Sequence, residues 1–326
     1  TRLQKYLSLL TGLILCTSVL AEQSLIESYS LLSRSGTYHI GVALDKQQRN
    51  WLQEKSQIVV GTSSSDYPPF DMTASGQDYE GLTADYAGLL ATALNVSIKV
   101  QRFATRDAAI KALEEGKIDL LGSSNGFEAA HPQLLLSIPY AIDQPVLVTR
   151  EGDTRSLSDG LDGMRLSMVY HYLPLEEVKA LYPKAIIQSY PSVQNAINAV
   201  AFDQADVFMG DTVSTHYMIN KGYLKNIKMA NFGKQETYGF SFAVSRNNTQ
   251  LLDIINATLK SVPNSERVSI AKRWSAGSDI LLTDQKLQLT DREERWLAQH
   301  PTVKVVVNVT MAPLTFFDAD GNFRGI

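Results

Sequence analysis

Side chains suited to holding a small polar molecule follow two of the apolar, strand-like stretches of this chain. Ser123, Ser124 and Asn125 come directly after one stretch, and Asp211 comes directly after another. Hydroxyl, amide and carboxylate groups can donate or accept hydrogen bonds to a ligand. Because open α/β sheets bind ligands at the carboxyl ends of their strands, these positions predict a binding site at a sheet edge.

Two aromatic pairs accompany these polar groups. Tyr67 and Phe70 flank two prolines, whose fixed φ angles favour an extended, kinked loop. Tyr170 and His171 follow a further predicted strand. Small-molecule pockets combine aromatic walls with a few polar groups, so we expect Tyr67, whose hydroxyl needs a polar partner, in the pocket. Phe70 is a second candidate, although packing as core beneath the loop is the simpler interpretation.

Catalytic and metal-binding patterns are absent from the sequence. It contains no G-x-S-x-G, H-E-x-x-H or P-loop motif. His131, His171 and His216 are far apart and lack the spacing of a metal site. We therefore predict no catalytic residue, metal or cofactor in this segment, and the sequence leaves open whether a longer chain carries an enzyme.

Composition agrees with a binding module. The chain has 326 residues, a net charge of −4 and 44% hydrophobic residues, which suits one two-lobed domain or two domains. The mild acidity gives no reason to expect nucleic-acid binding. A single cysteine excludes an intrachain disulfide.

Alternating strand and helix patterns must position the candidate residues. We expect strands at 58–61, 118–122, 163–168, 185–189 and 205–210, and helices at 84–94, 105–115, 175–181 and 193–202. Repeating β-α units favour parallel sheets with right-handed crossovers.

The order of elements resembles a type-3 periplasmic solute-binding domain. The segments that carry this resemblance are Ile58 to Asp85, Ala109 to Leu121, the S-x-P-Y motif at 137–140, Tyr238 to Val244 and Lys272 to Trp274. The resemblance implies an α/β, two-lobed periplasmic-binding-protein (Venus flytrap) fold of type II. Lobe one would hold residues 55–145 with a return at 240–275, lobe two would hold 146–235, and a hinge would close them around a small molecule.

The same resemblance bears on the ligand. Relatives that bind amino acids grip the carboxylate with an arginine shortly after the strand at 118–122, but residues 123–130 contain no arginine. We therefore expect a small-molecule ligand that is not a standard amino acid. Asp211 matches the family's amine-binding carboxylate, and it can equally cap a helix starting near Thr212.

The N-terminal region predicts export. Residues 1–21 read as a signal peptide, which indicates the periplasm, with an uncleaved anchor or a lipoprotein signal ending at Cys16 as alternatives. Residues 22–54 form an extension. Tyr38 to Val42 fits a lone strand, and Asp45 with Gln48 fits a capping box opening a helix to Lys55.

A long-period repeat predicts a second domain. The segment DKQQRNWLQE at 45–54 matches TDREERWLAQ at 290–299, so Trp51 and Trp296 lie 245 residues apart. We expect a first flytrap at 55–275, a linker helix at 276–300 opened by a capping box at Thr290, and the start of a second flytrap at 301–326. That start would comprise a β-rich run at 303–309 and a proline-aromatic loop at 313–317.

The junction before residue 301 resembles that of the tandem-flytrap hybrid sensor histidine kinases, the BvgS and EvgS group. This implies a ligand-sensing periplasmic segment, with an inner-membrane helix, kinase and homodimer contacts supplied beyond residue 326. The alternatives are a free solute-binding protein of an ABC transporter and a flytrap fused to a lytic transglycosylase.

Overall fold

A computed structural model describes two units of the chain, Thr1–Asp284 and Gln285–Ile326. The residues that it describes are 26–35, 40–73, 76–157, 160–222, 224–232, 239–277, 295–296, 298–300, 302, 304, 310–311, 315–317, 321 and 323–325. The predicted signal peptide and the predicted capping box at Thr290 lie outside them. Among the described residues, no helix combines the length and the apolar character needed to cross a bilayer.

Lobe one of the first unit is built on a seven-stranded sheet with the order β3-β1-β4-β2-β5-β12-β6. Its strands are β1 (Glu27–Leu31), β2 (Gln57–Ser63), β3 (Asp78–Tyr79), β4 (Ser97–Phe103), β5 (Leu120–Ser124), β6 (Leu134–Leu136) and β12 (Ser241–Ser245). Strand β2 runs parallel to both β4 and β5, whereas β12 runs antiparallel to β5 and β6.

Lobe two contains a five-stranded sheet with the order β11-β7-β10-β8-β9. Its strands are β7 (Pro145–Arg150), β8 (Arg165–Val169), β9 (Ile186–Tyr190), β10 (Val207–Asp211) and β11 (Ile227–Phe232). Strand β8 is parallel to β9 and β10, and β7 is antiparallel to β10 and β11.

The two sheets share one plan, which confirms the predicted two-lobed fold. Each has three parallel strands in the order second, first, third, followed by an antiparallel strand that arrives from the other lobe. The prediction of parallel sheets was wrong for these added strands. The segments that cross the hinge, β7 and β12, enter each sheet from the opposite end, so they run against the parallel strands.

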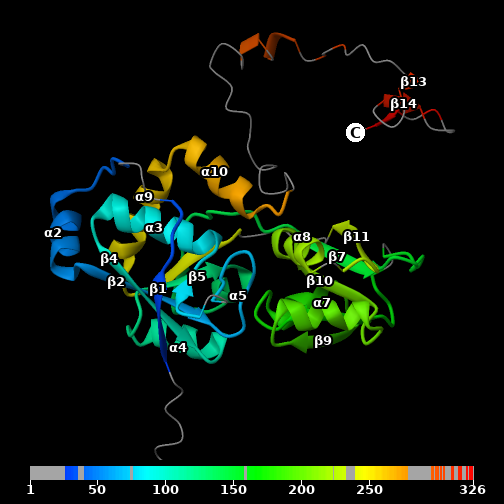
Figure 1. The fold of residues 1–326 in the computed structure, drawn as a ribbon, viewed down its shortest axis with the longest axis horizontal. Coiled ribbons are helices and arrows are strands. Elements are labelled where there is room, and N and C mark those ends of the chain that lie inside the picture. The colour runs from blue at the N-terminus through cyan, green and yellow to red at the C-terminus, as the bar shows by residue number, and fades with distance from the viewer. Residues whose placement is uncertain are drawn as a thin grey trace, which may run out of the picture. The chain divides into compact units, whose positions relative to one another are not determined.

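Nine helices are described in the first unit, and they cover the sheets (Figure 1). They are α2 (Lys46–Lys55), α3 (Leu82–Leu94), α4 (Arg106–Glu114), α5 (Gly126–Ala129), α6 (Leu175–Leu181), α7 (Val193–Ala201), α8 (Thr212–Lys221), α9 (Thr249–Ser261) and α10 (Asn264–Trp274). In lobe one, α3 and α9 belong to one apolar cluster and α4 belongs to another, because they pack on opposite faces of the sheet.

The N-terminal extension docks on lobe one differently from the prediction. Residues 40–42 form no strand, and the strand of this region is β1, which pairs with β4 and β3. The register places Glu27 opposite Arg102, whose guanidinium lies 3.3 Å from the Glu27 carboxylate. Ile40 is buried and contributes to the core instead. The capping box of α2 is confirmed, since Asp45 accepts from the Gln48 N–H and Gln48 accepts from the Asp45 N–H.

The second unit contains β13 (Thr310–Met311), β14 (Thr315–Phe317) and β15 (Phe323–Gly325) in one antiparallel sheet. The predicted loop at 313–317 was therefore wrong for residues 315–317, because Phe316 and Phe317 pair with Arg324 and Phe323. Of the predicted β-rich run at 303–309, only residue 304 is described.

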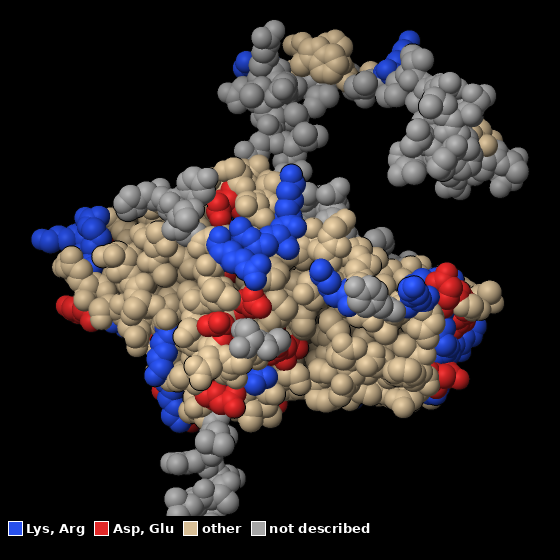
Figure 2. Space-filling view, viewed as in Figure 1, with Lys and Arg blue, Asp and Glu red and all other residues tan. Residues whose placement is uncertain are grey.

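Charge is mixed on the face shown in Figure 2. Acidic and basic residues lie near one another there, and most of that surface carries neither. This pattern matches the small net charge of −4.

Candidate functional site

The predicted site residues occupy the carboxyl ends of the parallel strands in both lobes. Tyr67 follows β2 and Asp211 ends β10. The structure joins them across the lobes, because the Tyr67 hydroxyl donates to Asp211 Oδ2 at 2.8 Å. The His171 ring, which follows β8, lies 5.7 Å from the Tyr67 ring. Tyr67 of lobe one thus meets two residues of lobe two that lie far along the chain from it.

Asp211 has both carboxylate oxygens engaged by protein groups. It is the N-cap of α8, and its Oδ1 accepts from the Ser214 N–H at 2.7 Å. Its Oδ2 accepts the hydroxyl of Tyr67. Burial raises the pKa of Asp211, against the opposing effect of these hydrogen bonds. The capping interpretation therefore accounts for one oxygen, and contact with lobe one accounts for the other.

Tyr67 and Phe70 differ in their surroundings. Burial, together with the negative charges of Asp211 and Asp143, raises the pKa of Tyr67 well above its usual value, so the hydroxyl remains a donor. Phe70 is fully buried, and its ring lies 4.0 Å from that of Phe240. This geometry agrees with packing as core beneath the loop.

Ser123 belongs to a buried network centred on Asp71. Its hydroxyl donates to Asp71 Oδ2, and the Tyr79 hydroxyl donates to Asp71 Oδ1. The backbone N–H of Ser123 donates to the Tyr140 hydroxyl at 2.8 Å, and Ser123 adopts a positive φ of 45°. Burial raises the pKa of Asp71, although the bonds from Ser123 and Tyr79 oppose that rise.

A buried arginine stands near Ser124 and Asn125, and the sequence prediction missed it. Arg106, the first residue of α4, donates from Nε to Glu128 at 2.6 Å, from Nη2 to the Gly122 carbonyl at 2.8 Å, and from Nη2 to the Ser124 hydroxyl at 3.3 Å. Glu128 also accepts from the Asn125 N–H at 2.9 Å. Residues 123–130 lack the arginine of amino-acid-binding relatives, and the buried arginine that lies nearby, Arg106, is paired with the internal carboxylate of Glu128. Glu128, a lone acidic residue shortly after the predicted strand at 118–122, was the sequence feature that could have indicated a buried basic partner.

Tyr170 forms a second direct link between the lobes. Its hydroxyl accepts from the backbone N–H of Arg106 at 2.8 Å. His171 is buried beside it, and burial lowers the pKa of His171 to about 3, aided by the positive charge of Arg106. The imidazole is therefore neutral at pH 7 and packs against the rings of Tyr67, Phe127 and Tyr170.

A further buried acid, Asp143, lies in the segment that leads into β7. It accepts the Tyr172 hydroxyl at 2.7 Å. Burial raises the pKa of Asp143 to about 7, and the negative charge of Asp211 adds to the rise. No sequence motif marks Asp143, because its raised pKa depends on burial by elements that are distant in the chain.

Protein groups thus engage Tyr67, Asp211 and Arg106 at the meeting edges of the two lobes. Seven of the eight predicted site residues are buried, and Tyr170 is partly exposed. Within the part of the chain that the structure describes, no group of three or more His, Cys, Asp and Glu residues is placed to hold a metal ion.

A comparison of the sequence with protein-family models identifies a family for this two-lobed domain. The model of the bacterial extracellular solute-binding proteins, family 3, matches residues 58–277. The chain belongs to this family. The matched range starts in β2 and ends just after α10, so the family 3 domain comprises both lobes and both hinge crossings.

The most informative relatives of this family 3 protein are sensor proteins. It is 41% identical over 300 residues to the virulence sensor protein BvgS of Bordetella bronchiseptica, covering 92% of this chain and 24% of BvgS. It is 26% identical over 325 residues to the sensor protein EvgS of Escherichia coli O157:H7, covering 98% of this chain and 27% of EvgS. The chain therefore spans about a quarter of the length of these relatives.

A solved structure supports the same relationship. The crystal structure of the B. pertussis BvgS periplasmic domain matches with a TM-score of 0.70 and 39% identity, covering 92% of this chain and 58% of that chain. The family 3 domain described above is thus homologous to a periplasmic sensor domain.

Proposed function

We propose that this chain is the periplasmic sensing region of a membrane-bound sensor histidine kinase, and that its first flytrap signals through the relative position of its lobes. Homology to BvgS and EvgS supports the sensor assignment. The inner-membrane segment, the kinase and the contacts of a homodimer belong, on this proposal, to residues beyond this chain.

Hydrogen bonds between the two lobes support this proposal. Tyr67 of lobe one binds Asp211 of lobe two, and Tyr170 of lobe two binds the backbone of Arg106 in lobe one. The groups suited to gripping an amino acid are committed as well, because Arg106 pairs with Glu128. The first flytrap therefore closes without a standard amino acid and acts as a modulating arm, with any small-molecule ligand acting by shifting that closure.

Helix α8 gives the lobes a route to the chain that follows. It begins at its cap Asp211, where Tyr67 contacts it. Near its other end, Asn220 donates to the Ala276 carbonyl at 3.4 Å, in the segment that leaves the domain after α10. A rotation of lobe two would therefore displace α8 and alter its contact with the exit segment.

Lobe one holds the same exit segment from the other side. Trp274, the last residue of α10, donates its indole N–H to Asp85 at 2.7 Å, and Arg273 pairs with the same carboxylate. Asp85 is fully buried in α3. Because lobe one fixes α10 and lobe two contacts Ala276, opening of the lobes changes the strain on the exit segment.

The proposal is tested in the full-length protein by measuring kinase autophosphorylation in membrane vesicles. Tyr67→Phe removes the hydroxyl that joins the lobes and is expected to change the output level. Tyr190→Phe is the matched control, since Tyr190 lies on β9 and its hydroxyl donates to its near neighbour Gln188 at 3.4 Å. Unchanged output in Tyr67→Phe, in a protein whose lobes are shown to separate, would overturn signalling by lobe position.

A further inference from the structure

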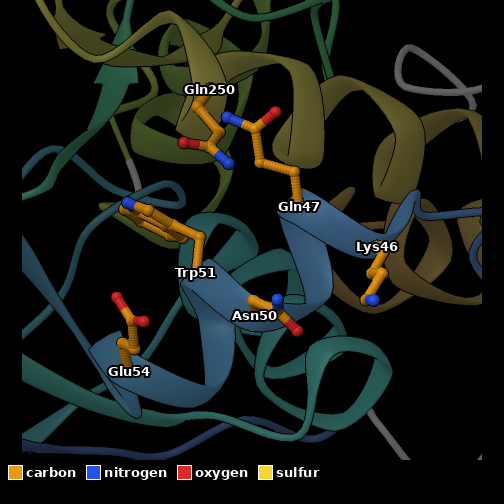
Figure 3. A pocket seen from close by; sticks show the side chains of 6 residues that line it. All are labelled: Lys46, Gln47, Asn50, Trp51, Glu54 and Gln250. Carbon is orange, nitrogen blue, oxygen red and sulfur yellow. The ribbon is translucent and has the colours of Figure 1, made fainter.

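A pocket lies on lobe one, outside the meeting edges of the lobes. Helix α2 and the start of α9 form it, with a volume of about 450 Å³ (Figure 3). Its lining comprises one indole ring, three primary amides, one carboxylate and one ammonium group: Trp51, Gln47, Asn50, Gln250, Glu54 and Lys46. This volume falls within the range of small-molecule sites.

The geometry of α2 explains why these groups converge. Positions 46, 47, 50, 51 and 54 share one face of a helix, because residues three and four apart are neighbours there. Leu52 is buried and fixes the helix to the core, while Trp51 packs partly against that core and borders the pocket. Figure 3 shows Gln250 reaching from α9 toward Gln47 above the Trp51 ring.

The polar side chains of this pocket are uncommitted. None of the six lining side chains makes a hydrogen bond or an ion pair with another residue of the described ranges. A primary amide carries two donors and an acceptor with two lone pairs, so Gln47, Asn50 and Gln250 together offer a dense hydrogen-bonding surface. Exposed side chains are ordinarily solvated, but here they surround an aromatic ring in a hollow.

The internal repeat keeps the tryptophan of this motif but not its amides. The second copy keeps the tryptophan, as Trp296, at the same position of the motif. At the positions of Gln47 and Asn50, however, it carries Arg292 and Arg295. The tryptophan is thus common to both copies of the motif, whereas the amides at positions 47 and 50 are particular to the first.

We propose that this pocket binds a saccharide that carries no net charge. The electron-rich face of Trp51 attracts the weakly positive C–H groups on one face of a pyranose ring, in the manner of other aromatic contacts. The amides of Gln47, Asn50 and Gln250 donate to and accept from neighbouring hydroxyls at the same time. Lys46 and Glu54 cancel in charge, which favours a neutral ligand, and an acetamido substituent would find an amide partner.

The experiment uses the 326-residue chain and three probes: triacetylchitotriose, maltotriose and, as a non-saccharide, L-arginine. Saturation-transfer NMR is expected to show contact with sugar ring protons, and titration is expected to saturate for at least one of the two saccharides. Trp51→Ala should weaken binding at least about tenfold, or roughly 1.4 kcal/mol. Gln47→Ala should weaken it several-fold, with Gln53→Ala, an exposed residue of α2 outside the pocket, as the matched control.

Three results would overturn the proposal. The first is no saturable binding of either saccharide up to about 10 mM, a range that covers even weak sites. The second is binding that both Trp51→Ala and Gln47→Ala leave intact. The third is a Trp51-dependent dimer in sedimentation experiments, which would make the pocket an interface between copies. Thermal unfolding checks that the Trp51→Ala variant is folded. If it is not, Trp51→Phe, which keeps an aromatic face, is measured in its place.

Discussion

The meeting edges of the two lobes have the same architecture but handle buried charge differently. In lobe one, Arg106 pairs with Glu128 at 2.6 Å, and Asp71 accepts hydroxyls from Ser123 and Tyr79, so these buried carboxylates find their partners within that lobe. At the lobe-two edge, Asp211 and the hinge residue Asp143 are held by tyrosine hydroxyls and a backbone N–H, and the negative charge of Asp211 contributes to the raised pKa of Asp143. The hydroxyl on Asp211 Oδ2 comes from Tyr67 of lobe one, so Asp211 depends on closure for that partner.

This difference assigns separate tasks to the two edges. The lobe-one pair is a fixed internal structure, because breaking it would leave a buried charge whether the lobes are open or closed. The lobe-two acids are the adjustable part, since opening would remove Tyr67 from Asp211 and admit water. Sensing by lobe position therefore centres on the residues around Asp211.

The largest effect is expected from breaking the lobe-one pair. Glu128→Gln leaves Arg106 buried without its counter-charge, which should lower the free energy of unfolding by roughly 3–5 kcal/mol. Urea denaturation measures this change. Asp162→Asn is the control, because Asp162 pairs with Lys184 at an exposed position and should matter little. A loss below about 1 kcal/mol for Glu128→Gln would contradict a buried, charge-paired Arg106.

Asp143 should make stability depend on pH. Its folded-state pKa of about 7 lies above the ordinary value of 3.8, so folding takes up a proton between these values. The stability that this provides is fully present below pH 3.8 and is lost as the pH rises to about 7. The free energy of unfolding of the wild type should fall as the pH rises from 5 to 8. In Asp143→Asn this fall should be smaller by about 2–3 kcal/mol.

Unfolding curves of both proteins at pH 5 and pH 8 check this expectation. Asp162→Asn, at an exposed site, should keep the wild-type slope. Equal slopes in the wild type and Asp143→Asn would mean that Asp143 is ionised in the folded protein, which removes the proposed charge difference between the lobes.

Tyr67→Phe should have an intermediate effect. It leaves Asp211 Oδ2 without its donor, and an unpaired buried acceptor costs about 1–3 kcal/mol. In a double-mutant cycle with Asp211→Asn, the two changes should be strongly non-additive, whereas Tyr190→Phe with Asp211→Asn should be additive. Additive effects for Tyr67 and Asp211 would show that the hydrogen bond contributes nothing to closure.

The smallest expected signal is a calorimetric one. Arg106 is already paired with Glu128, and Asp211 already accepts hydrogen bonds from Tyr67 and Ser214. The common L-amino acids should therefore give no binding heat at micromolar affinity. Isothermal titration of the 326-residue chain measures this. Micromolar binding of any of them would show that a ligand displaces these internal partners.

Local patterns were the most predictable part of the fold. Helix α6 has the predicted bounds of 175 and 181, and the Asp45 capping box formed as expected, because both depend on neighbours in sequence. Strand β1 was missed because the short segment 27–31 gains its stability from pairing with β4, far along the chain. Antiparallel β7 and β12 likewise follow from the hinge crossings rather than from local periodicity.

The candidate site was predictable in position but not in its partners. Strand ends located Tyr67, Ser123 and Asp211, because sheet edges follow from the β-α order. The roles of Arg106 and Asp143 could not be predicted from the sequence, because a buried ion pair and a shifted pKa arise only when separate elements pack together. Whether the eight candidates touch a ligand stays a prediction.

The most direct test of lobe closure is a distance measurement between the lobes in the full-length protein. Spin labels at Lys111→Cys on α4 and Lys179→Cys on α6 occupy exposed positions in lobe one and lobe two. With no ligand added, we expect one narrow, short distance, which lengthens when Tyr67→Phe and Asp211→Asn are combined. A broad, long distribution in the otherwise unaltered protein, insensitive to these substitutions, would contradict closure by the protein's own side chains.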